Sequence, residues 1–467
     1  MKTFYWYDYE TFGLKPQFQR IAQFAGIRTD ENLNIQDKHM FYCKPTHDCL
    51  PEPIACGVTG ISPLECEQKG LIEHEFINKI NQEFTKPETC IVGYNSIAFD
   101  DEFTRHTLFR NFIDPYAWHW ENGNTRWDIL NLVRFCYAHA KDSSLKWVYD
   151  DNKKPIFKLD NLAPANDIEH SDAHDAMADV RATIGIAKII KDSQPRLFDY
   201  ALSLRHKDVV SEKIELFSPM LYTSGLYPAK SSCTRLTTPL AYHPEYPKHR
   251  VIVFNLEQDP KTIVESDEEE LKKLLFAKGK KRLQTQVLAF NKSPMFTCEK
   301  RRIDSPKLHK QMKIDIVKCK QHLAYIEDNK DIIEKNIEYI YKKDSDREPS
   351  VDVDQSLYDN FISNKDREIC NAIQHLPLDQ ISSFRPNFED RKLSKLFQNF
   401  KARNYPESLT EDEKENWFEI VQSRVQSGEN SYLSFEHFEK SLNRLKEVDP
   451  NRLQLWQELE EYANRLL

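Results

Sequence analysis

The sequence predicts three successive parts: an α/β domain, a small β-rich domain and a helical domain. Within residues 1–195, short apolar runs alternate with segments of helical periodicity, a pattern typical of α/β domains. Residues 196–345 combine prolines, β-branched residues and short apolar alternation, which favours short strands. The polar stretch DSDREPSVDVDQ marks a change, and residues 346–467 repeat apolar side chains at helical spacing.

Length and composition are those of an ordinary globular protein. The 467 residues are enough for two or three domains, with 40% hydrophobic and 30% charged residues. No apolar run approaches the ~20 residues of a membrane helix, and Asp8 interrupts the first apolar run too early for a signal peptide. The 10 cysteines include no Cys-x-x-Cys pair, and the His and Cys spacing indicates no zinc site. We therefore expect a cytoplasmic protein with reduced thiols.

The first domain begins with a short apolar and aromatic run, residues 4–7, which is consistent with a central strand. Further strands are expected at residues 21–28, 40–43 and 90–94. Residues 70–84 have helical periodicity and place five apolar side chains on one side: Ile72, Phe76, Ile77, Ile80 and Phe84.

Two more helices are expected in this domain. Residues 127–130 open one of them, with Asp128 as its cap rather than as a catalyst. The clearest helix spans residues 171–191, with Ser171 or Asp172 as its cap. Its apolar residues recur at three- and four-residue spacing: Met177, Val180, Ile184 and Ala187.

The second part is expected to be a small barrel or sheet with an appended helix. Strands are favoured within residues 231–258, 284–290 and 293–297, and a helical pattern covers residues 314–341. In the third part, two stripes at helical spacing are expected to form core: Leu393, Leu396, Phe397 and Phe400, then Leu455, Leu459, Tyr462, Ala463 and Leu466.

The distribution of charge is more informative than the formal net charge of −9. Residues 272–320 contain 15 Lys or Arg but only three acidic residues, Glu299, Asp304 and Asp315. Such a basic surface on an acidic protein can follow a phosphate backbone. A solvated lysine-rich face is the alternative interpretation.

Four carboxylates and a histidine carry the chemistry of the first domain. Asp8 and Glu10 are two residues apart, so on a strand they share one face. Asp100 follows the strand expected at residues 90–94, and His174 precedes Asp179 by five positions. Acidic groups collected in one site require divalent cations, and a neighbouring imidazole can take a proton from water. This combination is what metal-assisted phosphodiester cleavage needs.

Each of these residues also has a simpler interpretation when taken alone. An Asp-x-Glu pair is common, Asp100 is compatible with a solvated helix start, and His174 with a cap or a packed side chain. The functional hypothesis depends on all five residues occurring together, in this order and on these expected elements.

The set resembles the DEDDh superfamily of 3′→5′ exonucleases, which combine three carboxylate motifs with a histidine five positions before the last Asp. Asp8 and Glu10 match the first motif, Asp100 the second, and His174 with Asp179 the third. More narrowly, the chain is similar to the bacterial exodeoxyribonuclease I family over essentially its whole length. The similar stretches are DYETFG, GYNSIAFDDEFTR, DPYAWHW, EHSDAHDAMADV, QPRLFDY and KARNYPESL.

This resemblance implies a ribonuclease-H-like exonuclease domain (residues 1–195), an SH3-like β-barrel domain (196–345) and a helical C-terminal domain (346–467). It also implies processive degradation of single-stranded DNA from the 3′ end, with release of 5′-mononucleotides, in DNA repair and recombination. The expected cofactor is a pair of Mg²⁺ ions, for which Mn²⁺ is a substitute. The expected partner is the acidic, hydrophobic C-terminal tail of the single-stranded DNA-binding protein. The expected state is a nucleoid-associated monomer.

Residue roles follow as hypotheses. Asp8, Glu10 and Asp179 hold the first Mg²⁺, Asp8 bridges to the second, Asp100 orients the second, and His174 deprotonates water. Six residues are candidates for substrate contacts: Glu10, Thr11, Phe12, Asn95, Phe99 and Lys158. Phe99 is equally compatible with core and Lys158 with a solvated position. Arg301 and Arg302 are candidates for the acidic tail.

Three other functions remain open at this point: an RNA-directed enzyme of the same superfamily, a proofreading subunit, and a non-catalytic nucleic-acid-binding scaffold. The long C-terminal half argues against the first two, because such chains are typically shorter. The intact acidic and histidine positions argue against the third.

Overall fold

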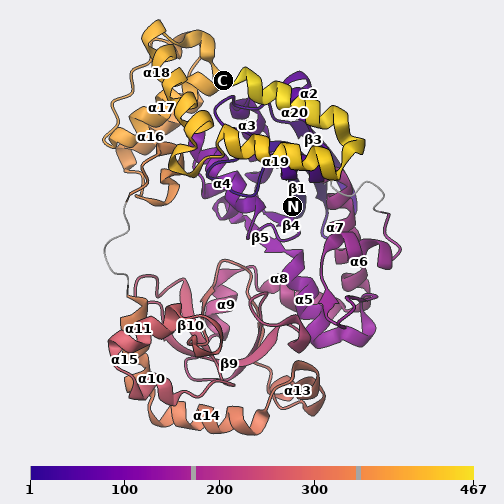
Figure 1. Cartoon of the computed structure of the whole chain (residues 1–467). Coiled ribbons are helices and arrows are strands. Elements are labelled where there is room, and N and C mark those ends of the chain that lie inside the picture. Colours follow the sequence, from indigo (N-terminus) through magenta and orange to yellow (C-terminus); the bar gives the residue numbers. More distant parts are fainter. Residues whose placement is uncertain (1, 170–174, 343–348) are drawn as a thin grey trace. The chain divides into compact units, whose positions relative to one another are not determined.

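The computed structural model describes residues 2–169, 175–342 and 349–467 (Figure 1). The chain forms two compact units. Unit 1 contains Met1–Asn124, Ser171–Arg181 and Glu348–Leu467, and unit 2 contains Thr125–His170 and Ala182–Arg347. The beginning and the end of the chain therefore belong to the same unit.

A five-stranded sheet in the order β3-β2-β1-β4-β5 organises the first domain. Its strands are β1 (Thr3–Thr11), β2 (Ile21–Thr29), β3 (Ile35–Tyr42), β4 (Thr89–Gly93) and β5 (Thr125–Asp128). The central β1 pairs antiparallel with β2 and parallel with β4, and β2 pairs antiparallel with β3. The strand expected at residues 4–7 is thus confirmed as central.

Two sequence expectations for this sheet need correction. The third strand begins at Ile35, earlier than the expected residues 40–43. Its first residues could not be predicted as strand, because they are exposed and lack an apolar pattern. Residues 127–128 end β5 instead of opening a helix. Helix α5 (Ile129–Ala140) begins directly afterwards, and Asp128 caps it as expected by accepting a hydrogen bond from the Leu130 backbone N–H.

The helices of the first domain pack through the faces that the sequence predicts. Four helices precede β5: α1 (Pro53–Thr59), α2 (Pro63–Lys69), α3 (Glu73–Phe84) and α4 (Asp100–Arg110). Four of the five predicted residues of α3 are buried against Tyr5, Tyr7, Tyr9 and Phe24 of the sheet. The fifth, Ile72, immediately precedes the helix.

Five helices of the C-terminal part complete unit 1: α16 (Asn364–Gln374), α17 (Arg391–Asn404), α18 (Glu411–Gln422), α19 (Phe435–Val448) and α20 (Leu453–Arg465). Both predicted stripes are confirmed as core, although Leu455 is only partly buried. They pack against the first domain. Phe397 and Phe400 contact Phe112, and Trp456 packs in one cluster with Phe12.

A buried ion cluster also joins the N-terminal and C-terminal parts of the chain. The Asp48 carboxylate accepts hydrogen bonds from Arg20 (2.9 Å), Arg403 (3.0 Å) and Arg424 (2.6 Å). Asp354 binds Arg403 and Arg424 as well. Burial alone would raise the pKa of Asp48, but the three guanidinium charges outweigh burial and hold the pKa well below its usual value.

Unit 2 is built on a second five-stranded sheet, in the order β11-β10-β9-β8-β12. Its strands are β8 (Met220–Thr223), β9 (Thr234–Tyr242), β10 (Arg250–Asn255), β11 (Thr285–Ala289) and β12 (Met295–Thr297). Four of them match the expected strand regions, and β8 is an addition. A short hairpin pairs β6 (Val148–Tyr149) with β7 (Pro155–Ile156).

Helices cover much of unit 2. They include α6 (Leu159–Ala165), α8 (Pro195–Ser203), α9 (Lys207–Lys213), α10 (Lys261–Glu265), α11 (Glu268–Phe276), α12 (Lys300–Ile303) and α13 (Pro306–Met312). The helical region expected at 314–341 is confirmed as two helices, α14 (Ile316–Asp328) and α15 (Lys330–Tyr341). Ile333 and Ile337 of α15 belong to the same core cluster as Phe254 of β10.

All 10 cysteines lie in the described ranges and are free thiols, and only Cys298 is exposed. Among the residues that the structure describes, no helix has the length and apolar character needed to cross a membrane.

We predict that Asp48→Asn lowers the free energy of unfolding by about 3–5 kcal/mol, because three buried guanidinium groups lose their shared counter-ion. Urea denaturation at neutral pH measures this. The matched control is Asp449→Asn, which removes a solvent-exposed pair with Arg452 and should cost less than about 1 kcal/mol. Equal effects of the two substitutions would contradict the role given to the ion cluster.

Candidate active site

Three of the predicted carboxylates converge in unit 1. Ligand oxygens of Asp8, Glu10 and Asp179 all lie within 4.8 Å of one another, in a geometry that could hold a metal ion. Asp8 and Glu10 share one face of β1, and Asp179 lies in the first turn of α7 (Ala176–Ser193). Glu10 is buried, whereas Asp8 and Asp179 are half-buried. Three carboxylates this close repel one another, so a divalent cation would stabilise the arrangement.

Gln23 on β2 brings α7 to this face of the sheet. It is directly opposite Glu10 in the β1–β2 register and is almost fully buried. Its side-chain oxygen accepts a hydrogen bond from the Ala176 backbone N–H (3.3 Å), and its Nε2 donates to Asp175 (3.5 Å). Asp175 in turn accepts a hydrogen bond from the Ala178 backbone N–H (3.3 Å). Sequence reasoning missed Gln23, since a lone glutamine in an apolar strand carries no motif.

Asp175 therefore caps the described part of α7. The caps predicted from the sequence, Ser171 or Asp172, lie outside the described residues. The candidate base His174 also lies outside them.

Asp100 is not one of the three converging groups. It is the first residue of α4 and is 3% exposed, and its charge acts on Tyr7 of β1. Burial and the charges of Asp101 and Asp100 raise the pKa of Tyr7 well above its usual value, so this phenol remains protonated. Tyr7 donates a hydrogen bond to Asp101 (2.7 Å), which connects β1 to the start of α4.

The residues proposed to contact substrate occupy different environments. Thr11 ends β1 and donates a hydrogen bond to the Gly13 carbonyl (2.7 Å), while Phe12 is buried in a core cluster. Asn95 is exposed in a turn with a positive φ of 66°. Phe99 is half-buried and packs on Phe103 (ring centroids 5.1 Å apart). Lys158 is exposed and belongs to unit 2.

Family comparisons assign all three parts of the chain. An "Exonuclease" model matches residues 5–187, an "Exonuclease I SH3-like domain" model residues 205–343, and an "Exonuclease I C-terminal domain" model residues 351–466. The expected order of a ribonuclease-H-like exonuclease domain, an SH3-like domain and a helical domain is therefore confirmed. Because the chain contains an exonuclease domain and its relatives are exodeoxyribonucleases, the protein is a nuclease.

Relatives match over all or most of the chain. Exodeoxyribonuclease I of Haemophilus influenzae is 39% identical over 100% of this chain and 99% of its own, and that of Escherichia coli is 38% identical over 89% and 88%. Among solved structures, E. coli Exonuclease I in complex with a dA16 oligonucleotide has a TM-score of 0.94 at 35% identity. Exonuclease I of Methylocaldum szegediense has a TM-score of 0.93 at 35% identity. Both alignments cover 100% of each chain. The chain belongs to the exodeoxyribonuclease I family.

Proposed function

We propose that this protein degrades single-stranded DNA from its 3′ end, releasing 5′-mononucleotides by metal-assisted hydrolysis. The observation that carries the proposal is the convergence of Asp8, Glu10 and Asp179 in an exonuclease domain. Single-stranded DNA is the substrate class supported by the relatives, since E. coli Exonuclease I has been solved with a dA16 and with a 5cy-dT13 oligonucleotide.

The carboxylates fit magnesium. All their donor atoms are oxygens, which Mg²⁺ prefers, and two of the three residues are half-buried and so leave room for water and phosphate. Asp8, Glu10 and Asp179 would hold one ion, and Asp8 would also help to hold a second, which Asp100 would orient. When bound, such ions supply Lewis-acid stabilisation of the phosphate and ease deprotonation of water.

The remaining roles belong to the chain itself. His174 accepts the proton of the attacking water, for which an imidazole is suited near neutral pH. We assign contacts with the terminal nucleotide to Asn95 and Phe99, which follow β4, and to Thr11 and Phe12, which follow the acidic pair on β1. Lys158 is assigned to a backbone phosphate.

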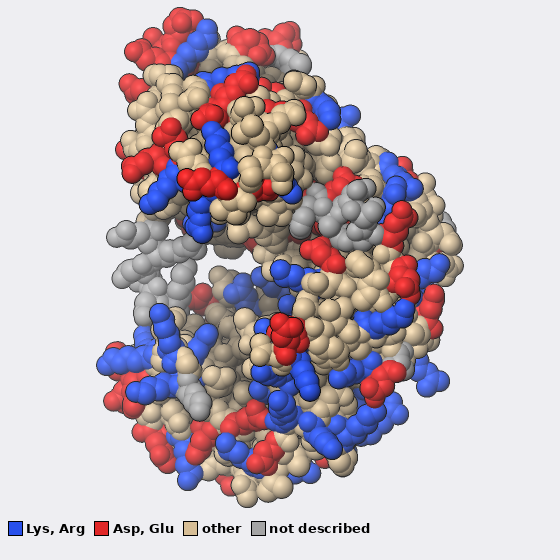
Figure 2. All heavy atoms as spheres, turned by 45° about the vertical axis from the view of Figure 1, so that its right-hand side comes forward, with Lys and Arg blue, Asp and Glu red and all other residues tan. Residues whose placement is uncertain are grey.

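The basic segment, residues 272–320, is proposed to follow the DNA backbone and to support processivity. Lys278, Lys281 and Arg282 are exposed, and so are most of the other basic residues of the segment. On the face shown in Figure 2, the surface formed by unit 2 carries many Lys and Arg side chains. Binding that depends on such contacts weakens steeply with salt.

Unit 2 also has a cavity suited to an acidic peptide. Its volume is about 350 Å³, and Lys141, Arg301, Arg302 and Lys307 contribute to its wall. The buried Leu308 adds an apolar surface. We assign the acidic, hydrophobic tail of the single-stranded DNA-binding protein to this cavity, where arginines bind carboxylates and Leu308 contacts an apolar side chain. A solved structure of SSB/Exonuclease I with an inhibitor supports such a partner.

These activities fit a role in DNA repair and recombination near the nucleoid, exercised by a monomer. We place the domain boundaries at residues 195/196 and 345/346.

We predict that Asp179→Asn slows Mg²⁺-dependent nucleotide release by about 10³-fold, through loss of several kcal/mol of transition-state stabilisation. The assay follows single strands labelled at either end. The wild-type enzyme should release a 3′ label at once and a 5′ label only at the end, and RNA of the same sequence should resist digestion. Asp192→Asn, an exposed change on the same helix, is the control. Undiminished release by Asp179→Asn, or release that starts at the 5′ end, would overturn the proposal.

His174→Ala should reduce turnover by about 10²–10⁴-fold, the usual contribution of a general base, while DNA affinity changes little. Single-turnover rates across pH report turnover, and fluorescence anisotropy reports DNA affinity. Loss of the acidic limb of the pH–rate profile in the variant is expected as well. Turnover close to that of the wild type would reject the assignment of His174.

Arg302→Ala should weaken binding of a peptide with acidic residues and a hydrophobic C-terminus by about tenfold or more, since a hydrogen bond between charged groups contributes roughly 1.5–3 kcal/mol. Digestion of bare DNA should change little, because Arg302 is one of 15 basic residues in the segment 272–320. Lys318→Ala removes an exposed charge that does not line the cavity and serves as the control. Equal peptide affinities of the two variants would exclude this cavity.

A further inference from the structure

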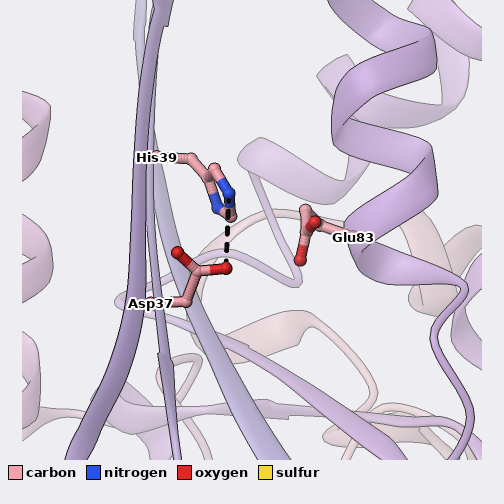
Figure 3. Close-up of side chains that lie close together, drawn as sticks. All are labelled: Asp37, His39 and Glu83. Carbon is pink, nitrogen blue, oxygen red and sulfur yellow. Dashed lines mark ion pairs between the residues drawn. The ribbon is translucent and has the colours of Figure 1, made fainter.

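A second group of metal-ligating side chains lies elsewhere in unit 1. Asp37 and His39 are two residues apart on one face of the edge strand β3, and Glu83 lies in the last turn of α3. Ligand atoms of the three lie within 4.8 Å of one another. Figure 3 shows both carboxylates turned toward the imidazole. None of these residues belongs to the nuclease carboxylates.

Residues other than the two carboxylates hold the imidazole of His39 in place. His39 Nδ1 lies 3.0 Å from the Tyr5 hydroxyl, and the ring stacks on Phe41 with centroids 6.0 Å apart. Gly26 makes this possible, because a Cβ at that position would lie 2.4 Å from the Tyr5 oxygen. A hydrogen bond to one ring nitrogen that orients the other is the usual support of a metal-binding histidine. His39 Nε2 is left to face the two carboxylates.

The distances fit a bound ion better than a direct hydrogen bond. His39 Nε2 and Asp37 Oδ2 are 3.4 Å apart, which is long for an N–H···O bond. Two ligands on a tetrahedral Zn²⁺, each at ~2.0–2.1 Å, lie about 3.4 Å apart. One imidazole proton can also serve only one of the two carboxylates, whereas a cation can bind both.

Two cations already contact Glu83, and they differ in character. Arg28 donates to Oε2 (3.1 Å) and is anchored by Thr3, Thr89 and the Glu83 carbonyl, so it fixes the carboxylate. Lys86 contacts both oxygens of Glu83 but is 48% exposed, and such surface pairs are weak. Oε1 therefore becomes available when Lys86 moves into solvent.

We propose that Asp37, His39 and Glu83 form a second divalent-cation site, selective for Zn²⁺-like ions over Mg²⁺, that fastens the edge strand β3 to the end of α3. Its nitrogen ligand favours borderline metals, whereas the all-oxygen set of Asp8, Glu10 and Asp179 favours Mg²⁺. Asp37 is 46% and His39 24% exposed at the side chain, which leaves room for water as a fourth ligand. This inference does not depend on the proposed nuclease mechanism.

The test is Zn²⁺ and Co²⁺ binding in excess Mg²⁺, using the full chain with Asp8→Asn to weaken the nuclease site. His39→Gln should lower affinity at this site by at least the ~10–100-fold that loss of an outer-shell partner costs. It should also remove the visible Co²⁺ absorption of the site. Lys86→Ala should tighten binding, because it removes the competing cation. His375→Gln, at an exposed helix-end histidine, is the matched control.

Zn²⁺ should raise the melting temperature of the Asp8→Asn protein and of its His375→Gln derivative, but not of its His39→Gln derivative. Melting without metal shows whether His39→Gln still folds. If it does not fold, the Lys86→Ala variant decides the test, because its Zn²⁺ affinity should rise. Unchanged Zn²⁺ affinity in His39→Gln, or no gain in Lys86→Ala, would overturn the proposal. DNA digestion in Mg²⁺ with Zn²⁺ chelated should be the same with and without His39→Gln when Asp8 is intact.

Discussion

The Asp48 carboxylate is the charge on which unit 1 depends. Its three arginine partners come from the residue just before β2, from α17 and from the segment after α18, so one buried anion joins residues more than three hundred positions apart in the chain. Any one of these groups buried alone would be strongly unfavourable, which makes the docked arrangement all-or-none. Packing of α17 and α20 on the first domain buries the apolar surface of both parts. The ion cluster fixes the position in which the two parts pack.

The alternation of β1 separates two kinds of chemistry. Tyr5, Tyr7 and Tyr9 turn to the α3 side, where they form core and where Tyr5 also supports His39. Asp8 and Glu10 turn to the other side and meet Asp179. The register agrees, because Gln23 is opposite Glu10 and anchors α7 on that same side. One strand thus presents an apolar face and a charged face. Because the apolar face is packed in the core, the strand is rigid and the acidic groups on its other face cannot move apart.

Sequence patterns predicted what depends on neighbours in the chain. Period-two spacing placed Asp8 and Glu10 together, and period-3.6 stripes identified the buried faces of α3, α17 and α20. The short β5 was missed because its four residues run directly into α5 with no turn signal. Gln23 and the group of Asp37, His39 and Glu83 left no trace in the sequence, since only strand pairing and helix packing bring them together. The joining of Asp179 to β1 was inferred from family resemblance and could not follow from spacing.

The discontinuity of unit 1 has a consequence for biosynthesis. Its sheet is translated first, α7 delivers Asp179 only after unit 2 has begun to emerge, and the helices that cover Phe12 and Asp48 come last. Until those helices have been made, the apolar surface around Phe12 stays uncovered and the Asp48 anion lacks two of its arginine partners. Nascent chains of this enzyme should remain clients of chaperones until the C-terminal helices emerge, and chains truncated before these helices should be proteolysed instead of accumulating as unregulated nucleases.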